Sequence, residues 1–358
     1  MRHTPAVAAA LLPLLLAGCT TPESPLLPPH IRPVVDKVGF AHQPEQLRWF
    51  LARTENLLLD LMDPLEEGPI KVILSPHDDY AYVQDLYPRL FHKVRARVAV
   101  LIGVAHKARK FDLADRLLFG DYIAWQAPGG EVPVSPLRDE LAAALAPGDH
   151  QCHRPLMTGE HSLEGLVPFL QYYSPGIEIV PVLVPAMPLD RMEELARRFA
   201  AALGDLMARR GLAWGRDLVL VISSDALHYG DRGWGRDLAP LGAGPEGNRR
   251  ALARENEIIR ECLLGTPRRE RIRRLYRALV DAGDYRKYRW TWCGRYSLPF
   301  GLLTALELTG EEKPLVNPFC VYTTSTHRPP LPVKEVGLGV TAPADERHWV
   351  GYLGMIWQ

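Results

Sequence analysis

The chain has 358 residues, equal numbers of basic and acidic side chains, and 47% hydrophobic residues. This length and apolar content exclude a disordered chain and allow one large α/β domain or two smaller ones. A formal net charge of zero gives no electrostatic basis for binding nucleic acid, so we expect no such partner.

The first nineteen residues form a segment of their own. A short basic start, Met1-Arg2-His3, precedes the apolar residues 6–16, and Leu16-Ala17-Gly18-Cys19 follows. The apolar run is too short to anchor stably across a bilayer. Its end resembles the lipobox of bacterial lipoproteins, which implies that residues 1–18 are a signal peptide and that Cys19 carries acyl chains such as palmitate. An ordinary secretory signal is the alternative.

A lipidated Cys19 would hold the protein to a membrane surface. No aspartate follows this cysteine, so we expect an outer-membrane rather than an inner-membrane lipoprotein, facing the periplasm. Residues 19–33 are rich in proline and predict an extended tether. Residues 34–358 are then the folded domain. Beyond Cys19 the chain has four cysteines, whose spacing shows no disulfide framework: Cys152, Cys262, Cys293 and Cys320. Any disulfide among Cys152, Cys262 and Cys320 is left open.

Short apolar runs within the domain predict strands that are buried on both faces. They are Lys71–Leu74, Val98–Ile102, Glu178–Val184 and Leu218–Ile222. Toward the C-terminus, three more runs predict antiparallel strands, at Phe319–Thr324, Glu335–Val340 and Val350–Trp357.

Helical periodicity appears between these runs, most clearly over Leu189–Arg210. Thr266 and Pro267 suit the N-cap and first turn of a helix that continues to residue 282. The other expected helices cover residues 44–62, 85–95, 136–146, 160–172, 247–264 and 298–308. This order predicts an α/β fold, a single mixed domain with a mostly parallel central sheet.

Three of the apolar strands are each followed within a few residues by a histidine: His77, His106 and His228. The carboxyl ends of parallel strands lie at one edge of a sheet, so we expect the three imidazoles there, with the strands of His77 and His106 as neighbours. Three imidazoles and one more ligand can hold a divalent transition metal. The alternative is that each is a hydrogen-bonded histidine at a strand end.

Several motifs occur in an order that resembles the Memo family. They are SPHDDY, GVAH, EHSLEGLVPFLQ, SSDALHYG, WTWCGR and VGYLG. Bacterial members of that family are called AmmeMemoRadiSam system protein B, and the family is similar in fold to class III extradiol dioxygenases. The resemblance runs from about Ile31 to the C-terminus and implies an extradiol-dioxygenase-like domain.

The resemblance also implies a ligand set. Carried onto this chain, the metal ligands are His77, His106 and Cys293, and His228 is the adjacent histidine, lining the same cavity as acid or base. A thiolate makes the site soft and favours iron or copper, with zinc as a further possibility. Taken without the resemblance, Cys293 would be a small buried apolar residue.

The chain departs from the family in having Asp78-Asp79 where Ala-Gly is usual, and GVAH where a serine often precedes the histidine. Five residues are expected to contact the ligands or the substrate: Asp78, Asp79, Glu160, His161 and Asp225. Asp225 could equally cap the turn after its strand. A serine hydrolase using Ser224 is disfavoured, because the chain has no GxSxG motif.

Two functions follow from these residues. One is a metal-dependent, dioxygenase-like oxidoreductase that acts on a small molecule, and the other is a non-catalytic protein that holds iron or copper outside the cytoplasm.

Overall fold

The computed structural model describes residues 30–54, 68–84, 86–310 and 314–358. The expected signal peptide, Cys19 and most of the proline-rich tether lie outside this part of the chain. The folded part starts before residue 34, because β1 (Ile31–Arg32) pairs in parallel with β5 (Ala124–Ala127). β6 (Gly130–Pro133) completes this small sheet.

Four parallel strands form the centre of the large sheet, in the spatial order β2, β9, β3, β8. They are β2 (Val72–Ser75), β9 (Leu218–Ser223), β3 (Val98–Val104) and β8 (Glu178–Val184). The prediction that the strands of His77 and His106 are neighbours is wrong, since β9 lies between them. Strand order depends on crossover connections, which apolar periodicity does not encode.

The edges of this sheet are mixed. β12 (Trp349–Trp357) runs antiparallel to β2, to β10 (His228–Tyr229) and to β11 (Phe319–Thr324). At the other edge, β4 (Leu117–Phe119) is antiparallel to β8 and parallel to β7 (His150–Cys152). The predicted single mixed α/β domain is confirmed, with the parallel arrangement confined to its centre.

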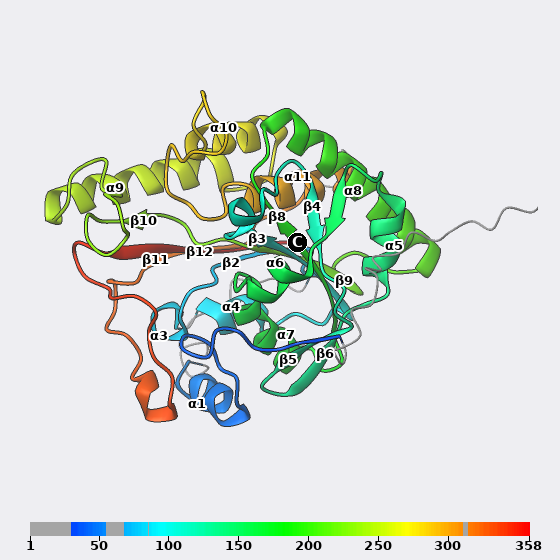
Figure 1. Cartoon of the computed structure of the whole chain (residues 1–358), viewed down its shortest axis with the longest axis horizontal. Helices are drawn as coiled ribbons and strands as arrows, with labels where there is room; N and C mark the ends of the chain where they lie inside the picture. The colour runs from blue at the N-terminus through cyan, green and yellow to red at the C-terminus, as the bar shows by residue number, and fades with distance from the viewer. Residues whose placement is uncertain (1–29, 55–67, 85, 311–313) are drawn as a thin grey trace, which may run out of the picture.

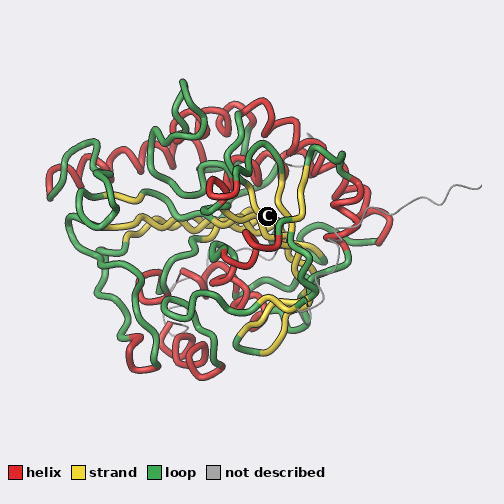
Figure 2. Tube along the Cα trace, viewed as in Figure 1, coloured by secondary structure: helices red, strands yellow, loops and turns green. Residues whose placement is uncertain are grey.

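Helices cover both faces of the sheet (Figures 1 and 2). One face carries α5 (Leu137–Ala144), α8 (Leu189–Arg210), α9 (Pro245–Ile258), α10 (Arg269–Leu279) and α11 (Ser297–Thr309). The other carries α1 (Pro44–Thr54), α3 (Tyr80–Val83), α4 (Leu86–Phe91), α6 (Arg154–Gly159) and α7 (Val167–Tyr173).

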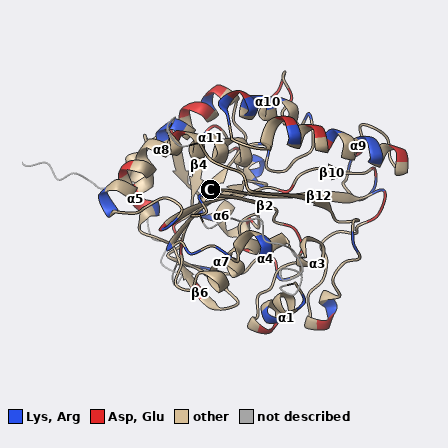
Figure 3. Cartoon of the chain, turned by 180° about the vertical axis from the view of Figure 1, so that it is seen from behind, with Lys and Arg blue, Asp and Glu red and all other residues tan. Residues whose placement is uncertain are grey.

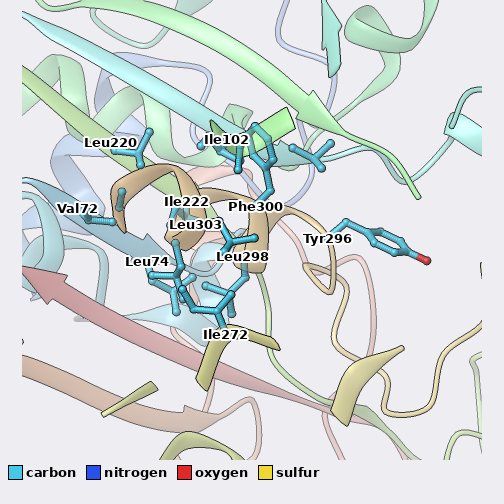
Figure 4. Packing of buried hydrophobic residues seen from close by; sticks show 14 of the residues in the cluster. Val72, Leu74, Ile102, Leu220, Ile222, Ile272, Tyr296, Leu298, Phe300 and Leu303 are labelled. Carbon is cyan, nitrogen blue, oxygen red and sulfur yellow. The ribbon is translucent and has the colours of Figure 1, made fainter. Parts of the chain in front are cut away.

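Alternate residues of the central strands supply the two hydrophobic cores, as the period of a strand requires. Leu74, Leu220 and Ile222 face the layer of α8 and α11 (Figure 4), whereas Ile73 and Val221 face the layer of α4 and α7. Basic and acidic residues are interspersed along the outer helices α8, α9 and α10 (Figure 3). No helix among the described residues is long and apolar enough to cross a membrane.

Two local predictions are wrong. The expected strand at Glu335–Val340 is a 3₁₀ turn, Val333–Val336, that ends at Gly337 in the left-handed region (φ 74°). The helix expected to start at Thr266 starts at α10, whose N-cap is Arg268. A π-helical turn, Ile259–Leu263, directly follows α9, so it lies between α9 and the start of α10.

The N-terminal strand is fastened by a buried ion pair between Arg32 and Glu164. The Arg32 guanidinium also lies over the ring of Trp125, 4.3 Å from its centroid. Arg32 Nε donates to the carbonyl oxygen of Met157 at 2.9 Å, and Nη2 donates to that of Glu160. Residues 31 and 32 are therefore part of the domain and not of a tether.

Candidate metal centre

His77, His106 and Cys293 converge at the carboxyl edge of the central strands. Each offers a ligand atom that lies within 4.8 Å of the other two. His77 follows β2 and His106 follows β3, so the two rings stand on either side of the end of β9, with centroids 5.2 Å apart. Cys293 comes from the segment before α11, and its Sγ lies 3.5 Å from His77 Nε2. His77 and Cys293 are buried, and His106 is the exposed member.

Ser223, the last residue of β9, fixes the tautomer of His77. The Ser223 hydroxyl donates its proton to the carbonyl oxygen of Ser162, so it accepts from His77 Nδ1 at 2.7 Å. Nδ1 therefore carries the ring proton, and the lone pair of Nε2 faces Cys293. No local sequence pattern indicates this role for Ser223.

Glu160 has the same effect on His106. Its Oε1 accepts from His106 Nδ1 at 2.8 Å, which leaves Nε2 as the free ligand atom. The backbone N–H groups of His106, His161 and Ser162 also donate to this carboxylate. Burial alone would raise the pKa of Glu160, but electrostatic attraction to His106 and His161, together with these hydrogen bonds, lowers that pKa to about 2. Glu160 thus stays ionised and orients the imidazole of His106.

Cys293 is held by the segment that follows β9. The backbone N–H of Asp225 donates to Cys293 Sγ at 3.1 Å, and Trp292 bridges to Leu227. A side chain on Gly294 would meet Ser224 Oγ at 2.0 Å, so only glycine permits this approach. Burial, followed by the negative charge of Asp225, raises the pKa of the Cys293 thiol well above its usual range. Cys293, Cys262 and Cys320 are free thiols.

The donor set fits a transition metal. An ion bound tetrahedrally at about 2.0 Å to nitrogen and 2.3 Å to sulfur places those two atoms about 3.5 Å apart. The observed separation of His77 Nε2 and Cys293 Sγ is 3.5 Å. Two imidazoles and a thiolate suit zinc, copper or iron and not magnesium or calcium.

Asp225 lies at this centre as well as in the turn after β9. Its Oδ1 accepts the backbone N–H of His77 at 2.8 Å, and its Oδ2 lies 3.5 Å from His77 Nε2. Burial, and then repulsion from Asp78, raises the pKa of Asp225 well above its usual range. Through its hydrogen bond to the backbone of His77, Asp225 connects the segments that follow β2 and β9 beside the candidate ligands.

Asp78 and Asp79 make their contacts elsewhere. Tyr352 Oη donates to Asp78 at 2.6 Å, and the backbone N–H of Thr341 donates to Asp79 at 2.5 Å. The backbone of Asp79 is ordinary (φ −49°), so replacing the usual glycine costs no strain here. Within the described chain, neither aspartate belongs to a group of side chains that could share an ion with the histidines.

Two further histidines flank the ligands. His161 stacks on His106 with ring centroids 4.8 Å apart, and burial together with repulsion from His106 lowers its pKa to about 4. Glu160, His106 and His161 form a second group of potential ligand atoms. His228 lies on β10 and its Nδ1 is 3.3 Å from the carbonyl oxygen of Thr291. Burial, followed by repulsion from His106, lowers the pKa of His228 to about 4, so its Nε2 is unprotonated near neutrality.

A cavity of about 900 Å³ opens beside the centre, and His106, Thr291 and Cys293 are among its lining residues. In the described chain His228 contacts the lining residue Thr291 but does not line this cavity itself, in contrast to the prediction. Its position on β10, five residues beyond β9, explains the difference.

Glu255 is a supporting residue that the sequence analysis missed. This buried carboxylate on α9 accepts from the indole nitrogens of Trp290 and Trp292, at 2.6 and 2.8 Å, and from Tyr322 Oη at 3.1 Å. It thereby holds the chain on the N-terminal side of Cys293. The one available signal was an acidic residue on the apolar face of α9, beside Ala251 and Ile258.

The chain is similar to proteins of one family. A family model described as "Memo-like protein" matches residues 39–328. MEMO1 family proteins match from Aquifex aeolicus (31% identical, over 49% of this chain and 61% of that protein), Caldivirga maquilingensis (28%, 44% and 52%) and Archaeoglobus fulgidus (28%, 51% and 65%). The match thus spans less than two thirds of the length of each of these relatives.

Proposed function

This chain belongs to the Memo-like protein family, and from that premise we propose that it is a metal-dependent oxidoreductase acting on a small molecule. The ligands would be His77 Nε2, His106 Nε2 and Cys293 Sγ. A bound iron or copper ion would supply electron transfer and Lewis-acid chemistry. The observation that carries the proposal is the cavity, which brings open space to two of the three ligand residues. A non-catalytic metal-holding site needs no such space.

The surrounding residues have separate tasks in this proposal. Glu160 and Ser223 hold the two imidazoles in the tautomer that presents Nε2. His228 would act as acid or base through Nε2 from beside the cavity, since its Nδ1 proton is directed at the carbonyl oxygen of Thr291, and Thr291 lines the cavity where His228 does not. Asp225 and Gly294 keep Cys293 Sγ against His77.

Metal analysis of the purified protein tests the ligand set. Wild type handled anaerobically under reducing conditions should contain about one iron or copper per chain, whereas His77→Ala, His106→Ala and Cys293→Ala should each lose most of it. The matched controls are His327→Ala, an exposed histidine, and Cys320→Ser, a free cysteine on β11. Metal retained in all three ligand variants would contradict the site.

The oxidation state of the ion separates catalysis from storage. Electron paramagnetic resonance should show the metal reduced by dithionite and reoxidised by oxygen within the folded protein. An ion that stays in one oxidation state would contradict the oxidoreductase and favour the alternative, a protein that holds a metal without turnover.

We also propose that Cys19 is lipidated and anchors the chain to the periplasmic face of the outer membrane. The support is the sequence Leu16-Ala17-Gly18-Cys19 after an apolar run. Labelled fatty acid should be incorporated into wild type and not into Cys19→Ser, which should accumulate as an uncleaved precursor. Equal labelling of the two would overturn this proposal.

A further inference from the structure

The cavity beside the metal centre has an unusually basic lining for a chain of zero net charge. Six cationic and three acidic side chains line it. The cationic residues are Arg109, Arg236, Arg286, Lys287, Arg289 and Arg295, and the acidic ones are Asp112, Asp237 and Asp284. Like charges gathered on a concave wall raise the local potential and attract anions.

The arginines of this wall lack close carboxylate partners among the described residues. Lys287 lies 3.5 Å from Asp284, but within the described chain none of the five arginines has a carboxylate at ion-pair distance. Arginines on the outer surface behave differently: Arg198, for example, contacts Asp149 at 2.9 Å. The cavity thus carries an excess of positive charge, although Asp115 and Asp112 attract Arg286 from beyond ion-pair distance.

Arg295 and Arg236 both stand over the ring of Tyr288. The guanidinium carbon lies 3.5 Å from the ring centroid for Arg295 and 5.5 Å for Arg236. Stacking on a ring face fixes a guanidinium while leaving its N–H edge free for a planar oxyanion. The guanidinium carbon of Arg295 also lies 4.5 Å from the ring centroid of Tyr296, a member of the hydrophobic cluster whose hydroxyl points away from the other labelled side chains (Figure 4).

One donor of Arg295 is conspicuously unused. Its Nε is buried and has no hydrogen-bond acceptor, and its Nη2 reaches only the carbonyl oxygen of Arg286 at 3.3 Å. Buried donors without an acceptor are uncommon in folded proteins, because leaving one unpaired is costly. Arg295 lines the cavity, so an oxyanion placed there would meet its terminal Nη groups and neutralise its charge.

We propose that the cavity binds a small organic anion, a carboxylate or phosphate, with its oxyanion between Arg295 and Arg236. This inference rests on the proposed function in one respect: the organic part of the bound anion is taken to be the substrate of the metal centre. Arg295 is two residues from Cys293, and both side chains line the cavity, so an anion held by the guanidiniums would share the cavity with the proposed ligand Cys293.

Calorimetric titration of the full-length protein with three phenyl compounds tests the proposal. Phenyl phosphate and benzoate carry the two candidate oxyanions, and benzyl alcohol is the uncharged analogue. Wild type should bind at least one anion at least about tenfold more tightly than benzyl alcohol, since a charge-assisted hydrogen bond contributes that much or more. The anion that binds more tightly shows whether the site prefers a phosphate or a carboxylate.

The variant Arg236→Gln/Arg295→Gln should weaken anion binding at least about tenfold and leave benzyl alcohol unaffected. The matched control is Arg197→Gln/Arg209→Gln, which removes the same charge from exposed positions of α8 and should stay within about twofold of wild type. Equal affinity for the anions and benzyl alcohol, or equal anion binding in the two double variants, would overturn the proposal.

Two measurements keep this inference separate from the proposed function. The titrations are repeated on Cys293→Ala, where the arginines remain and the thiolate is gone. Anion binding that persists there supports the anion site even if wild type proves to hold no metal. Metal content that is normal in Arg236→Gln/Arg295→Gln, together with lost anion binding, shows that the arginines bind substrate and not the ion.

Discussion

Glu160 accepts a hydrogen bond from His106 Nδ1 at 2.8 Å while also receiving the backbone N–H of the same residue. Both the ring and the main chain of one ligand are thus held by one buried carboxylate. The carboxylate comes from the segment between α6 and α7, which is far from β3 in sequence. The position of His106, the most exposed of the candidate ligands, is therefore fixed by a long-range contact.

Glu160→Gln should lower metal affinity about 10- to 100-fold, because the amide is a weaker acceptor and can present its NH₂ to Nδ1. Competition with a chromogenic chelator measures the change. Glu131→Gln, at an exposed position of β6, is the control and should bind metal as wild type does. Unchanged affinity in Glu160→Gln would show that the carboxylate does not orient His106.

Gly294→Ala should displace Cys293, since the added Cβ would meet Ser224 Oγ at 2.0 Å and Ser224 Cβ at 2.3 Å. We expect a loss of about 1–3 kcal/mol in the free energy of unfolding, as for other overpacked sites, together with loss of bound metal. Urea denaturation and metal analysis check the two effects. At Gly283 an added Cβ would have ordinary contact only, so Gly283→Ala should change neither quantity.

The stability of the protein should depend on pH through Glu255. Burial raises the pKa of Glu255 from 4.5 to about 7, so the folded state favours the protonated acid. A raised pKa stabilises the fold fully below pH 4.5, and this contribution is lost as the pH rises through 7. At about 1.4 kcal/mol per pKa unit, the loss is about 3 kcal/mol.

Glu255→Gln removes this titration while keeping an acceptor for both tryptophans. The difference in free energy of unfolding between this variant and wild type should therefore shift in favour of the variant by about 3 kcal/mol between pH 4.5 and pH 8. Urea denaturation across that range measures it. A difference that does not vary with pH would mean that Glu255 titrates normally.

Arg32→Ala should be costly because it leaves Glu164 buried and without its cation. Breaking a buried ion pair typically costs about 3–5 kcal/mol. Glu164 keeps the backbone N–H groups of Val35 and Asp36, so we expect the lower end of that range. Arg48→Ala removes an exposed partner of Glu45 and should cost less than about 1 kcal/mol. Chemical denaturation of both variants makes the comparison.

Sequence patterns predicted the central strands well because burial on both faces leaves unbroken apolar runs. The helix Leu189–Arg210 matched to the residue, since its apolar period is long and Gly211 ends it in the left-handed region. Strand order was not predictable, because β9 enters between β2 and β3 through long crossovers. The turn at Val333–Val336 was mistaken for a strand because alternating apolar residues and glycines also suit a turn.

In the candidate site, too, local patterns were predictable and long-range contacts were not. Histidines after apolar strands indicated where His77 and His106 would meet, and the family resemblance added Cys293. Nothing local distinguished Asp225, which contacts His77, from Asp78 and Asp79, which bond to β12 and the loop at Thr341. Their roles depend on which distant hydroxyl or N–H group each carboxylate meets. Ser223 and Glu255 were missed for the same reason.

The hydrogen bonds and ion pair of the Arg32 guanidinium have a mechanical consequence. Its guanidinium holds the carbonyl oxygens of Met157 and Glu160, and the carboxylate of that same Glu160 holds His106. A force applied to the chain on the N-terminal side of residue 30 would be borne first by these hydrogen bonds, because β1 adds only two residues of strand pairing. Tension on the N-terminal segment would therefore be transmitted to the residue that aims His106 before it reached the central sheet.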